Sequence, residues 1–139
     1  MALIAFLVED NLTIRENLIP ALEDLANARV VGFAETEETA AAWLTADRQE
    51  WQLAIVDLFL REGSGLGVVA RCRDRAPHQK VVVLSNYATR DIRERCMALG
   101  ADAVFDKSTE LEALIAYCDQ NRLSSLVPLT PLTPLMPTY

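Results

Sequence analysis

Apolar residues in this 139-residue chain gather in five short runs, each followed by polar residues. The runs are rich in β-branched and aromatic side chains and are too short for helices of ordinary length, so each predicts a β-strand. The segments between them repeat apolar residues at three- and four-residue spacing, which predicts amphipathic helices. The five predicted strands cover residues 3–8, 29–34, 53–57, 80–85 and 103–106.

The first predicted helix shows the features shared by the helical segments. Leu18, Leu22 and Leu25 have the spacing of one helix face, and Asn11 is a typical N-cap residue before them. Pro20 lies inside this segment, and we expect a kink rather than a break, because the apolar spacing resumes after it. The arginines of the third and fourth predicted helices are expected to lie on solvated helix faces.

A strand followed by a helix, five times over, predicts an α/β fold. Continuous apolar strands joined by helical crossovers form a parallel sheet with helices on both faces, so we expect a three-layer α/β/α sandwich. Residues 1–122 have the length of one domain. Residues 123–139 change to a Pro/Leu pattern of period three, typical of polyproline II, and this tail is expected to be extended or disordered.

Composition and charge exclude several classes of function. The formal net charge of -7 opposes phosphate-binding surfaces, so no direct nucleic-acid binding is expected. The three cysteines are far apart and lie in predicted helices, which predicts neither a disulfide framework nor a zinc site. No apolar run approaches the roughly 20 residues of a membrane span, and the N-terminus lacks the basic segment of a signal peptide. We therefore expect a cytoplasmic protein without membrane association.

Polar side chains follow four of the five predicted strands. Glu9 and Asp10 follow the first, Asp57 ends the third, Ser85 the fourth, and Lys107 follows the fifth. Ligands bind at the carboxyl edge of an open parallel sheet, where these residues should converge. Clustered carboxylates need a counter-cation, and an all-oxygen donor set suits Mg²⁺. With a hydroxyl and an amine nearby, the group suits transfer of a phosphoryl to an aspartate nucleophile.

Four fragments of the sequence, in this order, resemble the response-regulator receiver domain of two-component signalling. They are LVEDN, IVDLFLREGSGLGVV, VVVLSNYA and GADAVFDKS, and the resemblance covers residues 3–121. It implies a flavodoxin-like, CheY-like fold with five parallel strands in the order 2-1-3-4-5. It also implies a phosphoprotein of a phosphorelay, modified in a Mg²⁺-dependent reaction by a sensor histidine kinase or a phosphotransfer protein.

The resemblance implies a role for each residue at the strand ends. Asp57 would be the phosphoacceptor, and Ser85 and Lys107 would contact the phosphoryl oxygens. The Mg²⁺ ligands would be Asp10, Asp57, the backbone carbonyl of Phe59 and, through a water molecule, Glu9. The chain would be a signalling domain rather than an enzyme, with self-phosphotransfer and slow autodephosphorylation only. It would signal to a downstream protein or a second copy through the face formed by the fourth helix, fifth strand and fifth helix.

Two positions depart from the pattern of this family. Lys107 is followed by Ser108 instead of proline, and a cis non-proline bond costs about 3 kcal/mol, so this loop is expected to be trans or less rigid. The position three before the lysine, usually an aromatic switch residue, is Val104. Phe105 should point to the opposite face of the strand, since side chains alternate. Tyr87 is therefore the alternative candidate for sensing the modification.

Other functions fit parts of the pattern. A haloacid-dehalogenase-like phosphatase also uses a strand-end aspartate and Mg²⁺, but needs a second acid two residues later, where this chain has Phe59. A cobalamin-binding module needs a histidine after the third strand, and none follows Asp57. A pseudo-receiver that acts as a protein-interaction module without phosphorylation stays open because of Val104 and Ser108.

Overall fold

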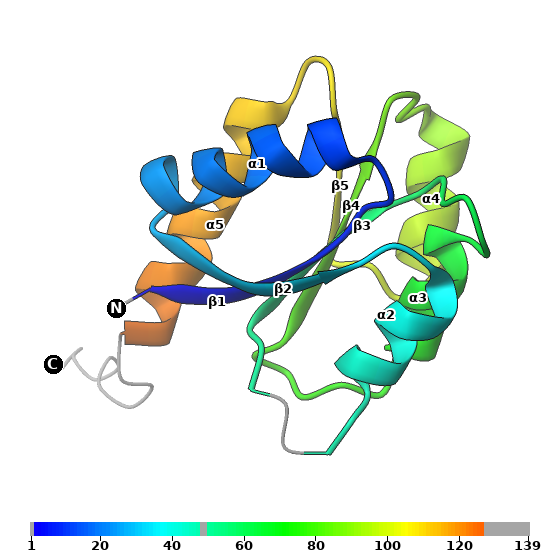
Figure 1. Cartoon of the computed structure of the whole chain (residues 1–139), viewed down its shortest axis with the longest axis horizontal. Coiled ribbons are helices and arrows are strands. Elements are labelled where there is room, and N and C mark those ends of the chain that lie inside the picture. Colours follow the sequence, from blue (N-terminus) through cyan, green and yellow to red (C-terminus); the bar gives the residue numbers. More distant parts are fainter. Residues whose placement is uncertain (1, 48–49, 127–139) are drawn as a thin grey trace, which may run out of the picture.

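Strands and helices alternate along the whole folded part of the chain (Figure 1). A computed structural model describes residues 2–47 and 50–126, with side chains through Asn121. The strands are β1 (Leu3–Val8), β2 (Ala28–Ala34), β3 (Leu53–Asp57), β4 (Lys80–Ser85) and β5 (Ala103–Asp106). The helices are α1 (Leu12–Leu25), α2 (Glu37–Leu44), α3 (Gly65–Arg71), α4 (Arg90–Leu99) and α5 (Leu111–Leu126). The predicted strand bounds are confirmed, except that β2 begins at Ala28.

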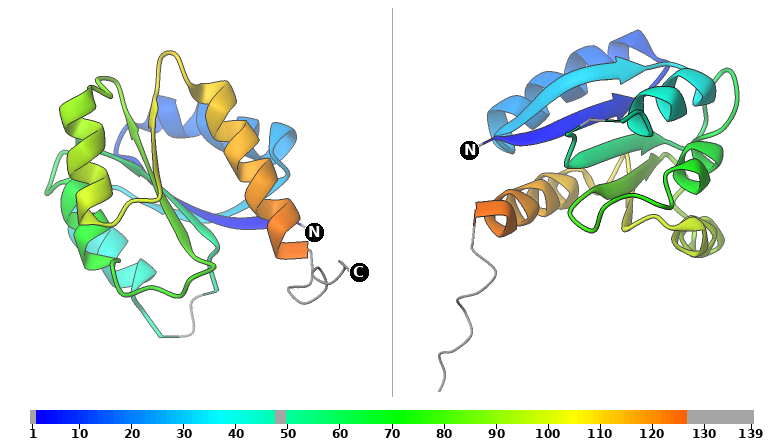
Figure 2. Two further views of the ribbon diagram at one scale, coloured as in Figure 1. Left: turned by 180° about the vertical axis from the view of Figure 1, so that it is seen from behind. Right: turned by 90° about the horizontal axis from the view of Figure 1, so that it is seen from below.

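The strands form one parallel sheet in the order β2-β1-β3-β4-β5, which confirms the predicted topology. Helices α1 and α5 lie on one face of the sheet, and α2, α3 and α4 lie on the other (Figures 1 and 2). The predicted three-layer sandwich is therefore present. Its central strands β1 and β3 pair directly, with Val8 beside Val56, so the loops that follow them start next to each other.

Two apolar layers hold the sandwich together, one on each side of the sheet. In β1, Leu3 and Leu7 pack toward α1 and α5, whereas Phe6 and Val8 pack toward α2, α3 and α4. Because both faces of the inner strands are buried, their sequences are continuous apolar runs rather than alternating ones. Trp51, just before β3, is also buried, and its indole N–H donates to the Leu44 carbonyl at 2.9 Å.

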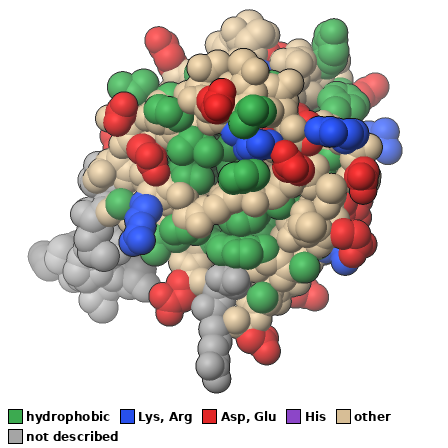
Figure 3. Space-filling view, in the orientation of Figure 1, with side chains coloured by type: hydrophobic (Ala, Val, Ile, Leu, Met, Phe, Trp, Pro, Cys, Tyr) green, Lys and Arg blue, Asp and Glu red, His purple; other side chains and the backbone are tan. Residues whose placement is uncertain are grey.

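Strand β2 forms one edge of the sheet and exposes two large apolar side chains. Val31 lies at an irregularity in the pairing of β1 with β2, and Phe33 lies two residues further on. Figure 3 shows hydrophobic side chains gathered across the middle of the molecular face on which β2 lies. The Arg15 guanidinium lies 4.2 Å from the centre of the Phe33 ring, a cation–π contact that covers part of the ring.

Helix α1 follows the prediction at its start and departs from it at its end. The Asn11 side chain accepts the Ile14 N–H at 2.9 Å, as expected of an N-cap, and the helix continues through Pro20 without a break. Leu25, however, is exposed and does not share the buried face of Leu18 and Leu22. The chain leaves the helix directly after Leu25, and the buried Ala26 takes the place against the core.

Helix α5 extends further than the expected boundary of the tail. It ends at Leu126, so residues 123–126, expected to be extended, are helical. These residues contain no proline, and the first residue that cannot continue a helix is Pro128. The remainder of the expected tail, 127–139, lies outside the described residues. Within the described part of the chain, none of the helices combines the length and apolar character of a membrane span.

Helix α3 begins in close contact with the end of β3. The Gly65 N–H donates to the Leu58 carbonyl at 2.9 Å, and this glycine is buried. A Cβ atom at Gly65 would overlap the Asp57 carbonyl oxygen and lie 2.8 Å from Leu58 Cα. The packing of α3 against the Asp57 backbone therefore requires glycine at this position.

We predict that Gly65→Ala lowers the free energy of unfolding by about 2 kcal/mol, because a backbone has to move to admit the methyl group. Urea unfolding followed by circular dichroism measures this. The matched control is Gly32→Ala, whose Cβ would meet the edge of the Phe6 ring at 3.1 Å, a side chain that can rotate. Equal losses in the two variants would contradict the prediction.

Candidate functional site

Three carboxylates meet at the carboxyl edge of the sheet. Oxygens of Glu9, Asp10 and Asp57, one from each residue, all lie within 4.8 Å of one another. They come together because β1 and β3 are neighbours, so the residues that end these strands are side by side. Glu9 and Asp57 are only 1% and 6% exposed. A buried set of carboxylate oxygens has the donor chemistry of a Mg²⁺ or Ca²⁺ site.

Lys107 supplies the positive charge that faces these acids. Its ammonium lies 2.9 Å from Glu9 Oε1 and 3.1 Å from Asp57 Oδ1. Three carboxylates face this one ammonium, so the cluster keeps excess negative charge that a bound cation would offset. The lysine reaches the acids from β5, two strands away from β3, because the loop after β5 lies at the same sheet edge.

Asp10 is tied to the loop that follows β3. Its carboxylate accepts the backbone N–H of Arg61 at 2.5 Å, and its carbonyl accepts an N–H of the Arg61 side chain at 3.5 Å. The Phe59 N–H donates to Asp57 Oδ1 at 3.4 Å, so the same loop contacts two of the three acids. This places Phe59, the expected carbonyl ligand, directly beside the cluster.

Two residues that were not predicted to belong to the site hold the segments that carry the acids. Arg15 is buried and donates to the Glu9 carbonyl at 2.9 Å while it pairs with Glu35 at 2.9 Å. The sequence carried one sign of this burial, because Arg15 lies three residues before Leu18 and therefore on the apolar face of α1. Glu37, at the start of α2, accepts the Ser64 N–H at 3.0 Å and so holds the far end of the β3–α3 loop. Only the folded chain brings Glu37 to that loop.

Ser85 and Lys107 lie on adjacent strands and their loops are bonded directly. Ser85 pairs with Asp106 in the sheet, and the Lys107 N–H donates to the Ser85 carbonyl at 2.9 Å. Ser85 is buried, and its hydroxyl oxygen accepts the Tyr87 N–H at 3.1 Å. Tyr87 itself is 70% exposed. The hydroxyl and the amine are thus held at the same edge as the acids.

Residues 104 and 105 point to opposite faces of the sheet, as the alternation predicts. Val104 is buried in the layer of α2, α3 and α4, whereas Phe105 packs in the layer of α1 and α5. The Phe105 ring lies 5.7 Å from the Tyr117 ring in an edge-to-face arrangement. Phe105 therefore does not take the place of an aromatic at position 104.

Ser108, in the position where proline is usual, binds the end of β5. Its backbone N–H and its hydroxyl donate to Asp106 Oδ1 at 2.8 and 2.6 Å. These two bonds are the largest causes that lower the pKa of Asp106 to about 2. The side chain of Ser108 therefore fixes the turn through hydrogen bonds rather than through a ring.

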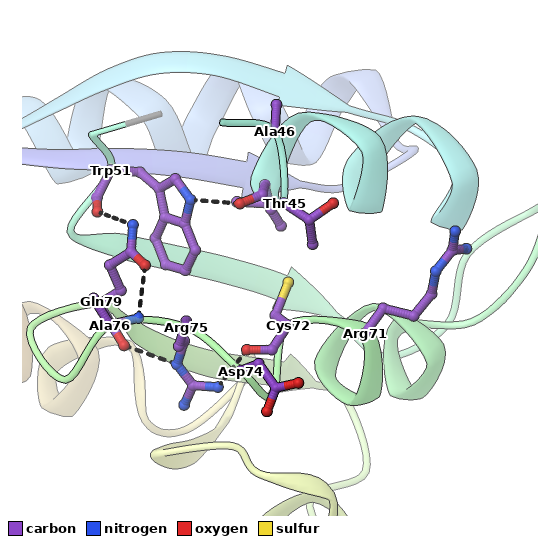
Figure 4. Close-up of a pocket in the computed structure, with 10 residues that line it drawn as sticks. Thr45, Ala46, Trp51, Arg71, Cys72, Asp74, Arg75, Ala76 and Gln79 are labelled. Carbon is purple, nitrogen blue, oxygen red and sulfur yellow. Dashed lines mark hydrogen bonds between the residues drawn. The ribbon is translucent and has the colours of Figure 1, made fainter. Parts of the chain in front are cut away.

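A cavity among the described residues lies at the opposite edge of the sheet. It has a volume of about 370 Å³ and is lined by Trp51, Arg75 and Gln79 among others (Figure 4). Gln79 donates to the Trp51 carbonyl at 3.1 Å, and Arg75 donates to the Gln79 carbonyl at 2.8 Å. Arg75 also pairs with Asp102 at 2.6 Å, so the expectation that it is a solvated residue is wrong. The polar groups here bind one another, and the acid cluster remains the candidate site.

Comparison with known protein families agrees with this geometry. Residues 5–119 match the response regulator receiver domain. The chain belongs to this family. Receiver domains are signalling domains of two-component systems, and the predicted resemblance is confirmed.

The curated relatives of this receiver domain are transcriptional and photosynthetic regulators. The photosynthetic apparatus regulatory protein RegA of Rhodovulum sulfidophilum is 34% identical over 100 residues, which cover 70% of this chain and 55% of RegA. The transcriptional regulatory protein YdfI of Bacillus subtilis is 26% identical over 113 residues, 81% of this chain and 52% of YdfI. The chain therefore spans about half the length of the curated relatives it matches.

A solved structure shares the fold. The response regulator protein from Burkholderia pseudomallei, solved with a phosphorylated aspartic acid, a calcium ion and citrate, superposes with a TM-score of 0.72 at 24% identity. The match covers 89% of this chain and 71% of that one. At this identity the likeness supports the fold of the receiver domain alone.

Burial makes the charged form of Asp57 unfavourable in the metal-free receiver domain. Its pKa is raised to about 6, chiefly by loss of solvent, with Glu9 adding to the rise and Lys107 opposing it. Since the folded pKa lies above the ordinary value of 3.8, the neutral carboxyl stabilises the folded state. That stabilisation is complete below about pH 4 and is lost as the pH rises through about 6.

We predict that Asp57→Asn raises the free energy of unfolding of the metal-free protein at pH 8 by about 1 to 3 kcal/mol, because asparagine cannot become charged. The gain should shrink as the pH is lowered toward 4. Urea unfolding in the presence of a chelator measures this at each pH. The control is Asp74→Asn, an exposed residue outside the cluster, for which little change is expected. A gain that does not depend on pH would contradict the prediction.

Proposed function

We propose that this receiver domain accepts a phosphoryl group on Asp57 and relays the signal by a conformational change. The observation that carries the proposal is the placement of the Lys107 ammonium 3.1 Å from Asp57 Oδ1, beside a cluster of three carboxylates. Phosphoryl transfer needs a nucleophile, a metal site and a fixed positive charge at one point. In this proposal Asp57, the carboxylate cluster and Lys107 would supply all three.

The proposed metal ion is Mg²⁺, and the carboxylate oxygens of the cluster fit it. Its ligands would be Asp10, Asp57, the Phe59 carbonyl and, through water, Glu9. When bound, Mg²⁺ would offset the repulsion among the acids and the negative charge of the phosphoryl oxygens. The preference for a cation follows from the unequal charge of the site, where three acids face a single lysine.

In the proposed reaction, a carboxylate oxygen of Asp57 attacks the phosphorus of a phosphohistidine. A phosphorus–oxygen bond forms, the phosphorus–nitrogen bond breaks, and the released imidazole takes a proton from solvent. Lys107 would then donate to one phosphoryl oxygen. The Ser85 hydroxyl would donate to another once it leaves the Tyr87 N–H, which its oxygen accepts in this structure. Hydrolysis of the acyl phosphate would return the site to its starting state.

The donor of the phosphoryl group would be a sensor histidine kinase or a phosphotransfer protein. The proposed output surface is the face of α4, β5 and α5, open to a downstream protein or to a second copy. We propose no binding of nucleic acid or membrane by this chain, and a cytoplasmic location. The domain would be a phosphoacceptor with self-phosphotransfer and slow autodephosphorylation, not an enzyme with a separate substrate.

The alternative of a phosphorylation-independent interaction module rests on Val104 and Ser108. Neither residue removes a member of the proposed reaction site, since Lys107 still contacts Glu9 and Asp57. Ser108 replaces proline by bonding Asp106, and Val104 lies on the far side of the strand from Phe105. The phosphoacceptor is therefore the function that the geometry favours.

Incubation with acetyl phosphate and Mg²⁺, followed by intact mass measurement, tests the proposal. We predict one added phosphoryl group for the wild type and none for Asp57→Asn. Asp10→Ala should abolish the addition, because it removes a direct ligand, whereas Glu9→Ala should slow it less. A chelator should prevent the reaction in every case. Addition of a phosphoryl to Asp57→Asn at the wild-type rate would refute the assignment of Asp57.

Phe59 and Tyr87 are 61% and 70% exposed and would flank the proposed acyl phosphate. We predict that these two side chains restrict the attacking water, so that exchanging both for serine speeds phosphate loss by about ten-fold or more. The phosphorylated protein is isolated and its phosphate release is timed. The control is Met97→Ser, which should leave the rate unchanged. Met97 is also an exposed apolar residue, but it lies on α4. An unchanged rate of phosphate loss in the double variant would contradict this prediction.

A further inference from the structure

The Arg93 guanidinium joins three separate segments of the receiver domain. From α4, its Nε–H donates to the Ala88 carbonyl at 2.9 Å and its Nη1–H to the Val104 carbonyl at 2.9 Å. Its Nη2–H donates to Glu110 Oε1 at 2.6 Å, which is also an ion pair. We call these four residues the Arg93 clamp. It connects the loop before α4, strand β5 and the residue before α5.

The clamp is more than a surface ion pair. The side chains of Arg93 and Glu110 are 38% and 36% exposed, so both are only partly solvated. Glu110 Oε1 also accepts the Asp106 N–H at 2.9 Å, which ties the carboxylate to the end of β5. Hydrogen bonds between charged groups are stronger than neutral ones, and a planar guanidinium fixes their directions. Arg93 therefore holds these segments in a defined arrangement.

Both loops that would contact the phosphoryl group are attached to the clamp. Ala88 lies three residues after Ser85, and Glu110 lies three residues after Lys107. The two loops also bond each other, through the Lys107 N–H and the Ser85 carbonyl at 2.9 Å. A shift of either loop therefore changes the distance between Arg93 and one of its partners.

A hydrogen bond within the loop after Ser85 holds that loop in this arrangement. The Ser85 hydroxyl oxygen accepts the Tyr87 N–H at 3.1 Å, and the next residue, Ala88, is bonded to Arg93. In the proposed reaction the Ser85 hydroxyl leaves the Tyr87 N–H to bind a phosphoryl oxygen on Asp57, which would displace this loop and strain the bond from Arg93 to Ala88. Val104 is small and buried, so no large side chain on β5 is available to follow the loop.

We propose that Arg93 is a positioning residue that holds the Ser85 and Lys107 loops in the arrangement without a phosphoryl group, and that phosphorylation weakens the Arg93 clamp. The inference rests on the proposed function of Asp57. A contact made in only one of two states biases the equilibrium toward that state. Loss of the clamp should therefore favour the phosphoryl-bound arrangement, and the exposed α4 and α5 surfaces become free to move relative to each other.

The test compares Arg93→Gln and Glu110→Gln with the wild-type chain. Binding of beryllium fluoride in saturating Mg²⁺, a mimic of the aspartyl phosphate, is measured by titration calorimetry, together with the rate of phosphorylation by acetyl phosphate. We expect both variants to bind the mimic about five-fold more tightly or better and to be phosphorylated faster. Affinity for Mg²⁺ alone should stay within about two-fold, because none of the clamp residues is a proposed metal ligand. A purely structural arginine would not separate these two affinities.

Arg90→Gln is the matched control. It makes the same substitution in the same helix, but Arg90 pairs with Glu94 within α4 at 3.1 Å, and these side chains are 91% and 64% exposed. Its affinity for the mimic should equal that of the wild type. A double-mutant cycle on Arg93 and Glu110 then gives their coupling, which should fall when Mg²⁺ and beryllium fluoride are bound.

The outcomes separate this inference from the proposed function. A wild-type chain that binds no mimic and gains no phosphoryl group overturns both. A wild-type chain that responds, with Arg93→Gln equal to Arg90→Gln or weaker in its binding, overturns the role of Arg93 alone. Loss of the folded circular dichroism spectrum in both clamp variants would show a structural role and would also overturn it.

Discussion

The excess of negative charge at one edge of the sheet is the constraint on which the rest of the structure depends. Glu9 and Asp57 are buried there within reach of Asp10, and Lys107 is bonded to two of the three. Buried charges are tolerated only when they are paired or bound to a metal, and burial already raises the pKa of Asp57 to about 6. The same imbalance that makes the metal-free edge unfavourable would give it affinity for a hard cation. Stability and the proposed function therefore involve the same three acids.

The scaffold around the acids restrains each loop that contributes to the edge. Arg15 holds the Glu9 backbone, Glu37 holds the loop after β3, and Ser108 holds the turn after β5. The first two restraints are hydrogen bonds between a side chain and a backbone group, and the third joins the Ser108 hydroxyl to the Asp106 carboxylate. Hydrogen bonds fix direction better than apolar contacts do. The apolar layers on the two sides of the sheet account for most of the buried side chains, and the hydrogen bonds fix the positions of the loops at the edge. Reaction geometry at the edge requires both.

The proposed coupling between the edge and the far helices passes through the bonds of Arg93. Strand β5 carries a valine where an aromatic is usual, and the guanidinium of Arg93 contacts its carbonyl instead. A small buried side chain cannot swing between two positions with a large change in contacts. A charged group with several directed bonds can change partners when a loop shifts, which is why the Arg93 clamp is the proposed link between phosphorylation and the α4, β5 and α5 face.

Sequence alone determined the order of strands and helices, the parallel sheet and the set of residues at its carboxyl edge. These follow from local patterns, because apolar runs, caps and strand ends are readable without knowing which segments meet. The predicted burial of Leu25 and the predicted end of α5 are wrong, because they were also taken from local patterns. Which residues of a helix are buried, and where the helix ends, depend on where the chain turns next. The roles of Arg15, Glu37, Arg75 and Arg93 were decided only by the tertiary structure. Each binds a partner that is distant in the sequence or across a loop. A charged side chain shows no sign in its own sequence neighbourhood of which backbone carbonyl or carboxylate the fold will bring to it.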